Sequence, residues 1–346
     1  MVEKYVRCSN CVLSASFPGI AFDEQGVCNF CNDKTFFSTE AGVIEKAKIR
    51  IRELFEEKKS QSEYDAILCF SGGKDSTLAL MLAVEHYHLK VLAFTLDNGF
   101  VSPTAVQNIR SVVDRLGVDL VTIRPSSVFF KKLVKASALC NIYNPKTLLR
   151  ISSVCNSCIS VVNNTALKIA IEKDIPFIIT GFTLGQIPLN AIIYKNNYKF
   201  LQESREPYLE KLRKEVGKTV DHYLCIPESI LDKVKCYPQT VNILCIENLN
   251  ETEMIKKIEP CGWNNPGDVD GCSTNCRLNT FNNYVHSRIY QYSPYELELS
   301  RLIRKKQLSR KEALYKISQQ PEGELKAVMA ELGITRKEID QRISVP

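Results

Sequence analysis

Six consecutive residues have the types and the spacing of a phosphate-binding loop. They follow the apolar run 66–70 and precede the apolar run 77–84, which predicts a buried strand, a glycine turn and the start of a helix. Such a turn directs free backbone N–H groups and the positive end of the helix dipole at one point, where an anion is stabilised. The alternative is a glycine-rich turn that only connects a strand to a helix. The six residues are Ser71, Gly72, Gly73, Lys74, Asp75 and Ser76.

The order of residues within the loop restricts the reaction. A Walker loop has four residues between its glycines, whereas Gly72 and Gly73 are adjacent, so the loop is not of the kinase or GTPase type. The backbone amides, Lys74 and the two serine hydroxyls can hold the β- and γ-phosphates of ATP, which leaves the α-phosphorus open to attack. Asp75 fits a ligand of Mg²⁺, because a carboxylate beside a triphosphate needs a cation. The predicted reaction is adenylation of an acceptor oxygen with release of pyrophosphate, followed by displacement of AMP.

The loop sequence Ser-Gly-Gly-Lys-Asp-Ser resembles the SGGxDS signature of the ATP pyrophosphatases, also called PP-loop enzymes. The resemblance implies an enzyme that uses ATP and Mg²⁺, transfers AMP to a substrate oxygen and has the adenine nucleotide alpha-hydrolase fold. PP-loop enzymes commonly contact ribose or adenine with an acidic or amide residue after the next strand. Asp97 and Asn98 stand at that place in this chain, and an Asn-Gly turn without a ligand is the alternative.

Three further apolar runs, at 91–96, 119–123 and 176–182, indicate strands. Apolar residues at helical spacing predict helices at 108–116 and 163–173. Strands that alternate with helices in this way predict an α/β fold with a doubly wound parallel sheet, in which ligands bind at the carboxyl ends of the strands. The residues expected at those ends are Asp97, Asn98, Gly181, Thr183 and Gln186.

The chain has 14 cysteines, well above ordinary usage. Cys8-x-x-Cys11 and Cys28-x-x-Cys31 form two pairs whose spacing suits a tetrahedral four-sulfur zinc site. A knuckle that binds Zn²⁺ is therefore predicted over residues 1–33, with a structural role because a closed coordination shell leaves no position for substrate. A four-iron cluster at the same cysteines is the alternative.

A third pair, Cys155-x-x-Cys158, opens the helical segment that leads to the strand ending at Gly181. The pair resembles that of the PP-loop enzymes that put sulfur into tRNA bases, the two-thiocytidine and two-thiouridine synthetases. In those enzymes the pair and one distant cysteine bind a 4Fe-4S cluster with one iron open for sulfur. The resemblance implies such a cluster here, with Cys276 or Cys272 as the distant partner. The alternatives are a dithiol redox pair, a second zinc site made by all four cysteines, and unligated thiols.

Most of the chain also resembles the bacterial N-acetyl sugar amidotransferases of surface-polysaccharide pathways. Those PP-loop enzymes have an N-terminal cysteine knuckle and use ammonia from a partner glutaminase. Nothing in amide transfer requires Cys155 and Cys158, so sulfur transfer is the favoured prediction and amide transfer the alternative. The non-enzymatic alternative is a nucleotide-sensing or adaptor module whose loop binds ATP without turnover. The segments that carry the resemblance are 8–13, 18–20, 22–24, 26–31 and the stretch 263–314.

Charge and composition add little about the acceptor. The formal net charge of +6 and the pI near 8.5 permit contact with nucleic acid but do not indicate a dedicated nucleic-acid binder. A sugar, another small molecule and a tRNA remain open as acceptors, and a sulfur donor protein or a glutaminase subunit is the expected partner. No apolar signal segment opens the sequence and no run approaches a membrane span, so a cytoplasmic enzyme without disulfides is expected. The apolar side of a predicted helix over 301–316 is compatible with a homodimer.

The pattern of segments predicts four parts: the zinc knuckle at 1–33, a first helix within 34–63, the PP-loop domain at 64–250 with an insertion at about 190–235, and a helical region at 251–346 whose loop around Cys272 folds back on the cleft. The four histidines have no ligand spacing, so metal binding is assigned to thiolates. Cys69, Cys225, Cys236 and Cys245 lie in apolar stretches and are expected in the core.

Overall fold

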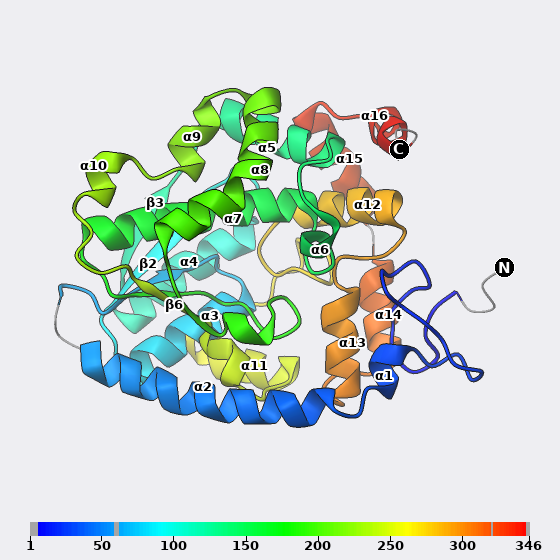
Figure 1. The fold of residues 1–346 in the computed structure, drawn as a ribbon, viewed down its shortest axis with the longest axis horizontal. Helices are drawn as coiled ribbons and strands as arrows, with labels where there is room; N and C mark the ends of the chain where they lie inside the picture. The colour runs from blue at the N-terminus through cyan, green and yellow to red at the C-terminus, as the bar shows by residue number, and fades with distance from the viewer. Residues whose placement is uncertain (1–5, 59–61, 320, 344–346) are drawn as a thin grey trace.

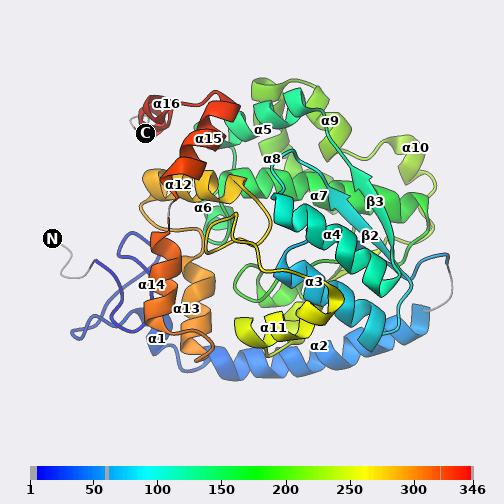
Figure 2. The same ribbon diagram turned by 180° about the vertical axis from the view of Figure 1, so that it is seen from behind.

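The computed structural model describes residues 6–58, 62–319 and 321–343. Within these residues a six-stranded sheet lies at the centre, with the strand order β3-β2-β1-β4-β6-β5 (Figures 1 and 2). All neighbouring strands are parallel except β5, which pairs antiparallel with β6 at one edge. The described strands are β1 (Ala66–Cys69), β2 (Val91–Leu96), β3 (Asp119–Ile123), β4 (Phe177–Ile179), β5 (Ile193–Lys195) and β6 (Gln239–Val241).

Both faces of the central strands are buried. Successive residues point to opposite faces, so Ile67 and Ile178 belong to the core on one face, whereas Leu68 and Phe177 belong to the core on the other. A strand that is buried on both faces reads as a continuous apolar run. This is why the apolar runs of the sequence predict β1, β2 and β4.

Helices cover both faces of the sheet (Figure 1). One face is covered by α2, α3, α4 and α11, and the other by α5, α7, α8, α9, α12 and α15. The described α-helices are α1 (Asn29–Asn32), α2 (Phe36–Lys58), α3 (Lys74–Met81), α4 (Pro103–Leu116), α5 (Ser127–Leu139), α6 (Pro145–Leu148), α7 (Ser153–Glu172), α8 (Tyr198–Val216), α9 (Thr219–Leu224), α10 (Glu228–Leu231), α11 (Glu251–Ile258), α12 (Leu278–Tyr290), α13 (Glu296–Arg304), α14 (Arg310–Ser318), α15 (Glu322–Leu332) and α16 (Arg336–Ile343). A π-helical turn, Leu82–His86, follows α3, and short 3-10 turns lie at Leu189–Ala191, Ile243–Ile246 and Glu259–Cys261.

The predicted fold class is confirmed: the chain forms an α/β fold with a doubly wound, mostly parallel sheet, an N-terminal cysteine cluster and a helical C-terminal region. Two helices begin earlier than predicted, because serine residues cap them. Ser102 accepts a hydrogen bond from the backbone N–H of Ala105 at the start of α4, and Ser152 does so from Cys155 at the start of α7. The prediction that Cys236 is a core residue is wrong, since it is exposed, whereas Cys245 is buried.

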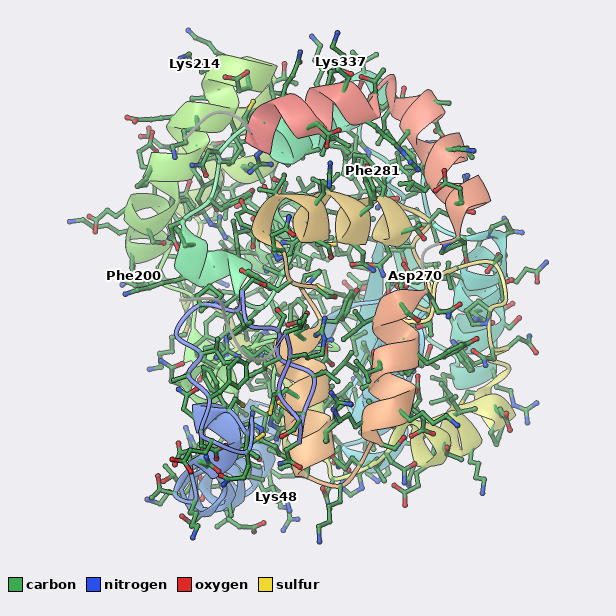
Figure 3. All side chains as sticks on the ribbon, turned by 90° about the vertical axis from the view of Figure 1, so that its right-hand side faces the viewer. Lys48, Phe200, Lys214, Asp270, Phe281 and Lys337 are labelled. Atoms are coloured by element: carbon green, nitrogen blue, oxygen red, sulfur yellow. The ribbon has the colours of Figure 1, made fainter. Side chains whose placement is uncertain are left out.

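The C-terminal region packs against the sheet domain on the side shown in Figure 3, where α12 lies between the pair α15–α16 and the pair α13–α14. α12 contacts α7 of the sheet domain as well as α15 and α16. The loop that precedes α12 is bonded to the segment after β2: Ser102 N donates to Asn275 O and Arg277 N donates to Phe100 O, each at 2.9 Å. The loop therefore lies at the carboxyl edge of the sheet, and its fold-back toward the cleft agrees with the prediction.

The N-terminal cysteines form a small separate core with Leu13, Phe17 and Tyr292. A buried carboxylate attaches this core to α13. Glu296 accepts hydrogen bonds from Arg7 Nη1 and from Ser14 N, each at 2.8 Å. The cysteine segment is thus fixed to the C-terminal region and lies away from the sheet (Figure 1).

The four predicted parts remain predictions. The predicted knuckle, the first-helix segment and the C-terminal region include residues 1–5, 59–61, 320 and 344–346, which lie outside the described residues. Within the described residues α2 falls in the first-helix segment, and α8, α9 and α10 fall in the predicted insertion.

By length and composition, one helix of the described chain is apolar enough to cross a bilayer. This helix is α7, and 44% of its most apolar 18-residue window is buried. α7 packs on β1 and β4 and against α5 and α9. Its apolar composition is accounted for by this position in the core of the fold.

Candidate nucleotide and thiol site

The predicted phosphate-binding loop, residues 71–76, connects the end of β1 to the start of α3 and is called the PP-loop below. β1 lies between β2 and β4, so the chain proceeds to one side of β1 first and later returns to the other side. This arrangement is a topological switch point, where open α/β sheets bind ligands at the carboxyl ends of their strands. The N-terminus of α3, which begins at Lys74, is directed to that point and favours an anion.

Close backbone packing explains two of the glycines. Gly72 has a φ of +72°, and a Cβ atom there would lie 2.4 Å from Ala105 O in α4. A Cβ atom on Gly181, directly after β4, would lie 2.9 Å from Ser76 N. The PP-loop is therefore held between the start of α4 and the end of β4 without room for a side chain at either position.

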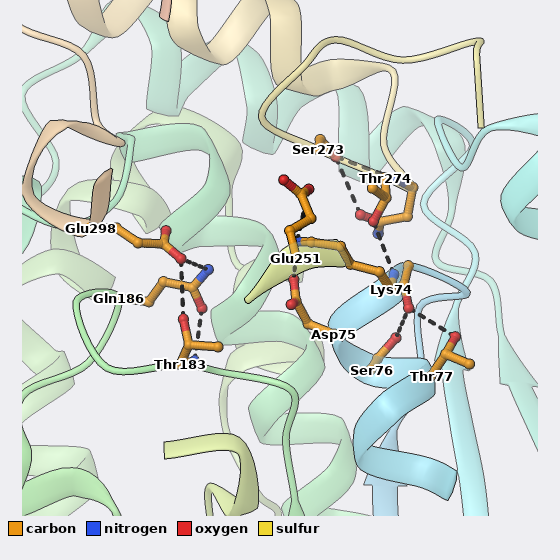
Figure 4. Close-up of polar contacts among 12 residues, drawn as sticks. Lys74, Asp75, Ser76, Thr77, Thr183, Gln186, Glu251, Ser273, Thr274 and Glu298 are labelled. Atoms are coloured by element: carbon orange, nitrogen blue, oxygen red, sulfur yellow. Dashed lines mark hydrogen bonds and ion pairs between the residues drawn. The ribbon is translucent and has the colours of Figure 1, made fainter. Parts of the chain in front are cut away.

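Lys74 is surrounded by carboxylates and by a loop of the C-terminal region (Figure 4). Its Nζ lies 3.0 Å from Asp75 Oδ2 and 4.0 Å from Glu251 Oε1, at the first residue of α11. Burial by itself would lower the pKa of Lys74, but Asp75 and Glu251 outweigh it and raise the pKa. The backbone N–H of Lys74 donates to Thr274 Oγ1 at 3.0 Å. The ammonium group is thus charged and placed beside the amides of the PP-loop.

The hydroxyl groups of the PP-loop stabilise the turn. The Ser71 and Ser76 hydroxyl oxygens lie 3.0 Å apart. Ser76 and Thr77 both donate to Gly73 O, at 3.1 and 2.9 Å. Both serine residues also line the second of the two cavities above the loop.

Two cavities meet above the PP-loop. The first, of about 140 Å³, is lined by charged side chains that include Lys74 and Glu251. The second, of about 290 Å³, is lined mostly by apolar, amide, hydroxyl and thiol groups, and Asp75 is its charged lining residue. Asp75, Gln186 and Tyr295 line both cavities. The two cavities are thus neighbouring parts of one cleft, with a charged end and a nearly uncharged end.

Three of the predicted cysteines line the second cavity together with Ser71, Ser76 and Gly181. Cys155 and Cys158 come from the first turns of α7, and Cys276 comes from the loop before α12. Asn282 Nδ2 donates to Cys155 Sγ at 2.9 Å, and Asn98 Nδ2 donates to Cys158 Sγ at 3.6 Å. Residues that are more than 100 positions apart in the sequence therefore share one wall of the cleft.

Burial holds these thiols in the neutral form. It raises the pKa of Cys155, and it raises the pKa of Cys158 to about 12. The pKa of Cys276 is raised by burial and further by the negative charge that Cys158 and Cys155 would carry. The three groups are thus poor free nucleophiles, and a bound cation would be needed to turn them into thiolates.

Asp97 and Cys272, both predicted site residues, do not line the second cavity. Asp97 is not among its lining residues; its Oδ2 lies 3.5 Å from Arg124 Nε and its Oδ1 accepts from Gly99 N. Cys272 lines the first cavity instead, where its thiol donates to Lys316 O at 3.6 Å. Asn98 lines the second cavity, whereas its neighbour Asp97 does not, so only the amide of these two residues faces this cavity.

The four N-terminal cysteines form a compact group. The ligand sulfurs of Cys8, Cys11, Cys28 and Cys31 all lie within 4.8 Å of one another, and in the described part of the chain no other set of three or more cysteine, histidine or acidic ligands does so. Cys8 Sγ and Cys31 Sγ are 4.0 Å apart, and Cys11 Sγ and Cys28 Sγ are 3.8 Å apart. Sulfurs around one zinc ion are separated by about 3.8 Å, because each Zn–S bond is about 2.3 Å long and the geometry is tetrahedral. The group can therefore hold a single zinc ion.

Sequence reasoning missed cleft residues that belong to the C-terminal region. Glu298 of α13 accepts hydrogen bonds from Thr183 Oγ1 and Gln186 Nε2, each at 3.1 Å (Figure 4). Burial, and then the Asp75 carboxylate, raise the pKa of Glu298. Asn282 is buried and its Oδ1 has no partner among the described residues. Their sequence neighbourhoods contain no motif, so only packing identifies them.

The fold and the cleft define an α/β protein with an anion-binding loop of the PP-loop sequence pattern at the switch point of its sheet. The chain matches no protein-family model. It is 24% identical over 274 residues to an uncharacterized protein of Methanocaldococcus jannaschii, MJ1599, and the match covers 78% of each chain.

Two solved structures of enzymes show a distant likeness. The U34-tRNA thiolase NcsA from Methanococcus maripaludis, solved with its [4Fe-4S] cluster, has a TM-score of 0.34 at 14% identity, over 87% of this chain and 86% of the thiolase. The NH3-dependent NAD synthetase from Campylobacter jejuni, in complex with nitrate, has a TM-score of 0.31 at 15% identity, over 67% of this chain and 99% of the synthetase. At these scores neither likeness bears on the function of this protein.

Proposed function

We propose that this protein is an ATP pyrophosphatase that adenylates a carbonyl oxygen of its acceptor and then replaces that oxygen with sulfur. The observation that carries the proposal is the shared cavity of about 290 Å³, in which Cys155, Cys158 and Cys276 face the same space as the PP-loop residues Ser71 and Ser76. A group activated at the PP-loop would thus lie next to the thiols. The cofactors of the proposal are ATP with Mg²⁺ and a cluster held by the three thiols.

In the first step, the acceptor carbonyl oxygen bonds to the α-phosphorus of ATP while the bond from that phosphorus to the bridging oxygen breaks. Lys74 and the amides at the start of α3 take up the negative charge that develops on the departing pyrophosphate. Asp75, which lines both cavities, would hold Mg²⁺ beside the bound nucleotide. The products are an acceptor–AMP intermediate and pyrophosphate.

In the second step, hydrosulfide attacks the activated carbon, AMP leaves with the original oxygen, and loss of the S–H proton leaves the carbon doubly bonded to sulfur. The three thiols of the cavity come from α7 and from the loop before α12, and an iron-sulfur cluster can use three such thiolates because each binds a different iron. When bound, such a cluster supplies an iron that is open to sulfur. The N–H groups of Asn282 and Asn98 donate to two of the thiols and would stabilise their anionic form.

Anaerobic metal and sulfide analysis tests the proposal. Protein purified without oxygen is expected to be brown, with absorbance at about 400 nm and about four iron and four sulfide per chain. Cys155→Ser, Cys158→Ser and Cys276→Ser are each expected to lose the iron, because three ligands are needed to hold the cluster. Cys236→Ser is the matched control, because this thiol is exposed and should not affect the iron content. Wild-type protein without iron or sulfide would contradict the sulfur-transfer step.

N-acetyl sugar amide transfer is the second candidate, favoured by the resemblance of most of the chain to those amidotransferases. It shares the first step and differs in the nucleophile, which would be ammonia from a partner glutaminase. A colourless protein that contains zinc alone and is activated by a glutaminase subunit would favour amide transfer. Zn²⁺ at the N-terminal cysteines and a cytoplasmic location belong to both candidates.

A further inference from the structure

Two of the four basic side chains that line the charged cavity are not bound to the buried carboxylate of Glu40. The four side chains are Lys74, Arg301, Lys305 and Lys316. Arg301 and Lys305 are both bound to Glu40, whose side chain is only 2% exposed, so they serve to neutralise a buried carboxylate. Lys74 and Lys316 remain as the cations that a ligand can recruit.

Lys74 and Lys316 share one carboxylate. Lys316 Nζ lies 2.9 Å from Glu251 Oε2, while Lys74 Nζ lies 4.0 Å from Glu251 Oε1. Burial would raise the pKa of Glu251, but Lys74 and Lys316 outweigh it and lower the pKa. Glu251 is thus a carboxylate bridge between a lysine of the PP-loop and a lysine of α14, although these lie far apart in the sequence.

The same region also caps the PP-loop. Thr274 Oγ1 accepts the backbone N–H of Lys74 at 3.0 Å, and a Cβ atom on Gly73 would lie 2.9 Å from Thr274 Oγ1. Lys316 Nζ donates to Gly271 O at 3.1 Å, so the lysine also contacts the loop that carries Thr274. Thr274 Oγ1 thus lies at the amide of Lys74 (Figure 4), and the Glu251 carboxylate is shared by the two lysines, so both are oxygen acceptors beside groups that can bind an anion.

We propose that Lys316 is the second cation of the pyrophosphate subsite, supplied to the PP-loop by the C-terminal region. The inference rests on the proposed function, because it names a residue that binds the departing group of that reaction. Pyrophosphate displaces Glu251 from Lys74 and Lys316, since a phosphate group is the stronger acceptor for two ammonium groups. Glu251 therefore competes with the ligand, while Lys316 binds it.

Binding measurements with three ligands test this inference. The dissociation constants of inorganic pyrophosphate, ATP and AMP are measured by titration calorimetry without added divalent cation. Lys316→Gln is expected to weaken the binding of pyrophosphate and of ATP by about 10-fold to 100-fold, which is the contribution of a hydrogen bond to a charged group. The affinity for AMP is expected to stay unchanged, because AMP lacks the β- and γ-phosphates. Glu251→Gln is expected to tighten pyrophosphate binding, since it removes the competing charge.

Two controls make the result interpretable. Lys311→Gln removes an exposed lysine of the same helix and is expected to bind all three ligands as the wild type does. Lys74→Ala removes the cation of the PP-loop itself, and it is expected to weaken the binding of pyrophosphate and of ATP. It shows how large the effect of losing one cation is. A variant that misfolds would lose AMP as well, and it could not produce the opposite effects expected of Lys316→Gln and Glu251→Gln.

Failure of the inference and failure of the proposed function give different results. If the wild type binds ATP and pyrophosphate while Lys316→Gln binds both within twofold of the wild type, the inference is wrong and the adenylating function stands. If the wild type binds neither ligand, the proposed function is wrong and the inference is wrong with it. Weaker binding of AMP as well as pyrophosphate by a folded Lys316→Gln would also contradict the assigned role.

Discussion

Gly181 illustrates how much of this cleft is decided by single residues. It follows β4, and its Cα lies so close to the first turn of α3 that a Cβ atom would be 2.9 Å from Ser76 N and 3.0 Å from Ser76 Cα. Both atoms belong to the backbone, which cannot give way as a flexible side chain can. A methyl group at Gly181 would therefore push the end of β4 away from the PP-loop.

A methyl group added at Gly181 is expected to affect both ATP binding and the stability of the protein. Gly181→Ala is expected to weaken ATP binding by about tenfold or more and to lower the free energy of unfolding by about 1–3 kcal/mol, because overpacking forces the backbone to shift. The dissociation constant of ATP and a urea titration measure the two effects. Gly267→Ala is the matched control, since a Cβ atom there meets no atom within 4 Å. Equal ATP affinity in the two variants would contradict the prediction.

At the scale of secondary-structure elements, a buried ion pair joins α2 to α13. Arg301 donates to both carboxylate oxygens of Glu40, through Nε at 3.0 Å and Nη2 at 2.6 Å, and Lys305 pairs with the same carboxylate. Arg301 also donates to Leu184 O in the segment after β4. The Glu40 carboxylate therefore fixes α2 to α13 of the C-terminal region and, through Arg301, to the segment after β4 that lines the cleft.

Breaking this pair is expected to be costly. Glu40→Gln should lower the free energy of unfolding by about 3–5 kcal/mol, because the buried Arg301 and the partly buried Lys305 would remain without their counter-charge. Glu45→Gln in the same helix is the control and should change it by less than about 1 kcal/mol, since Glu45 is 68% exposed and pairs with Lys48 at the surface. Denaturant unfolding at neutral pH measures both values, and similar values would contradict the role of the pair.

The ion pair of Glu40 with Arg301 and Lys305 also makes the stability of the protein depend on pH. Burial would raise the pKa of Glu40, but Arg301 and Lys305 lower it below the ordinary value of 4.5. A carboxylate whose pKa is lower in the folded state stabilises the protein fully above its unfolded pKa and loses this effect as the pH falls through the folded value. The difference in stability between the wild type and Glu40→Gln should therefore shrink below about pH 4.5.

At the scale of the whole molecule, the cysteine knuckle is attached to the C-terminal region and not to the cleft. Arg310 at the start of α14 donates to Cys11 O at 2.9 Å and to Cys8 O at 3.0 Å. None of the described residues from 6 to 33 lines either cavity of the cleft. The knuckle is thus expected to stabilise α13 and α14 without touching bound ligands.

Loss of one of the four N-terminal cysteines should therefore change the stability of the protein without changing its affinity for ATP. Cys28→Ser is expected to remove about one zinc ion per chain and to lower the Tm by several degrees, because metal binding adds to folding stability. ATP affinity, measured below the Tm, should stay within twofold of the wild type. Unchanged zinc content, or loss of ATP binding while the protein remains folded, would contradict this division of roles.

Sequence and structure agree best where chemistry is local. The run before the PP-loop, the glycine turn and the start of α3 were predictable because adjacent residues set them through backbone sterics and alternating burial. The edge strand β5 was not, since its three residues are half-buried or exposed and give no clear period. Asp97 and Cys272 show the same limit at the site: each has the right type and stands near the right place, yet neither lines the thiol cavity.

The sequence by itself determined the loop 71–76 and the spacings of the cysteine pairs, because a few neighbouring residues suffice to fix a turn or to place two sulfurs on one helix face. Only the tertiary structure decided that Cys276 lines one cavity with Cys155 and Cys158, that Thr274 bonds to Lys74, and that Lys316 and Glu298 line the charged cavity together with Lys74. Those contacts join segments separated by more than 100 residues. They depend on how α12, α13 and α14 pack against the sheet, and no local pattern of residue types encodes that packing.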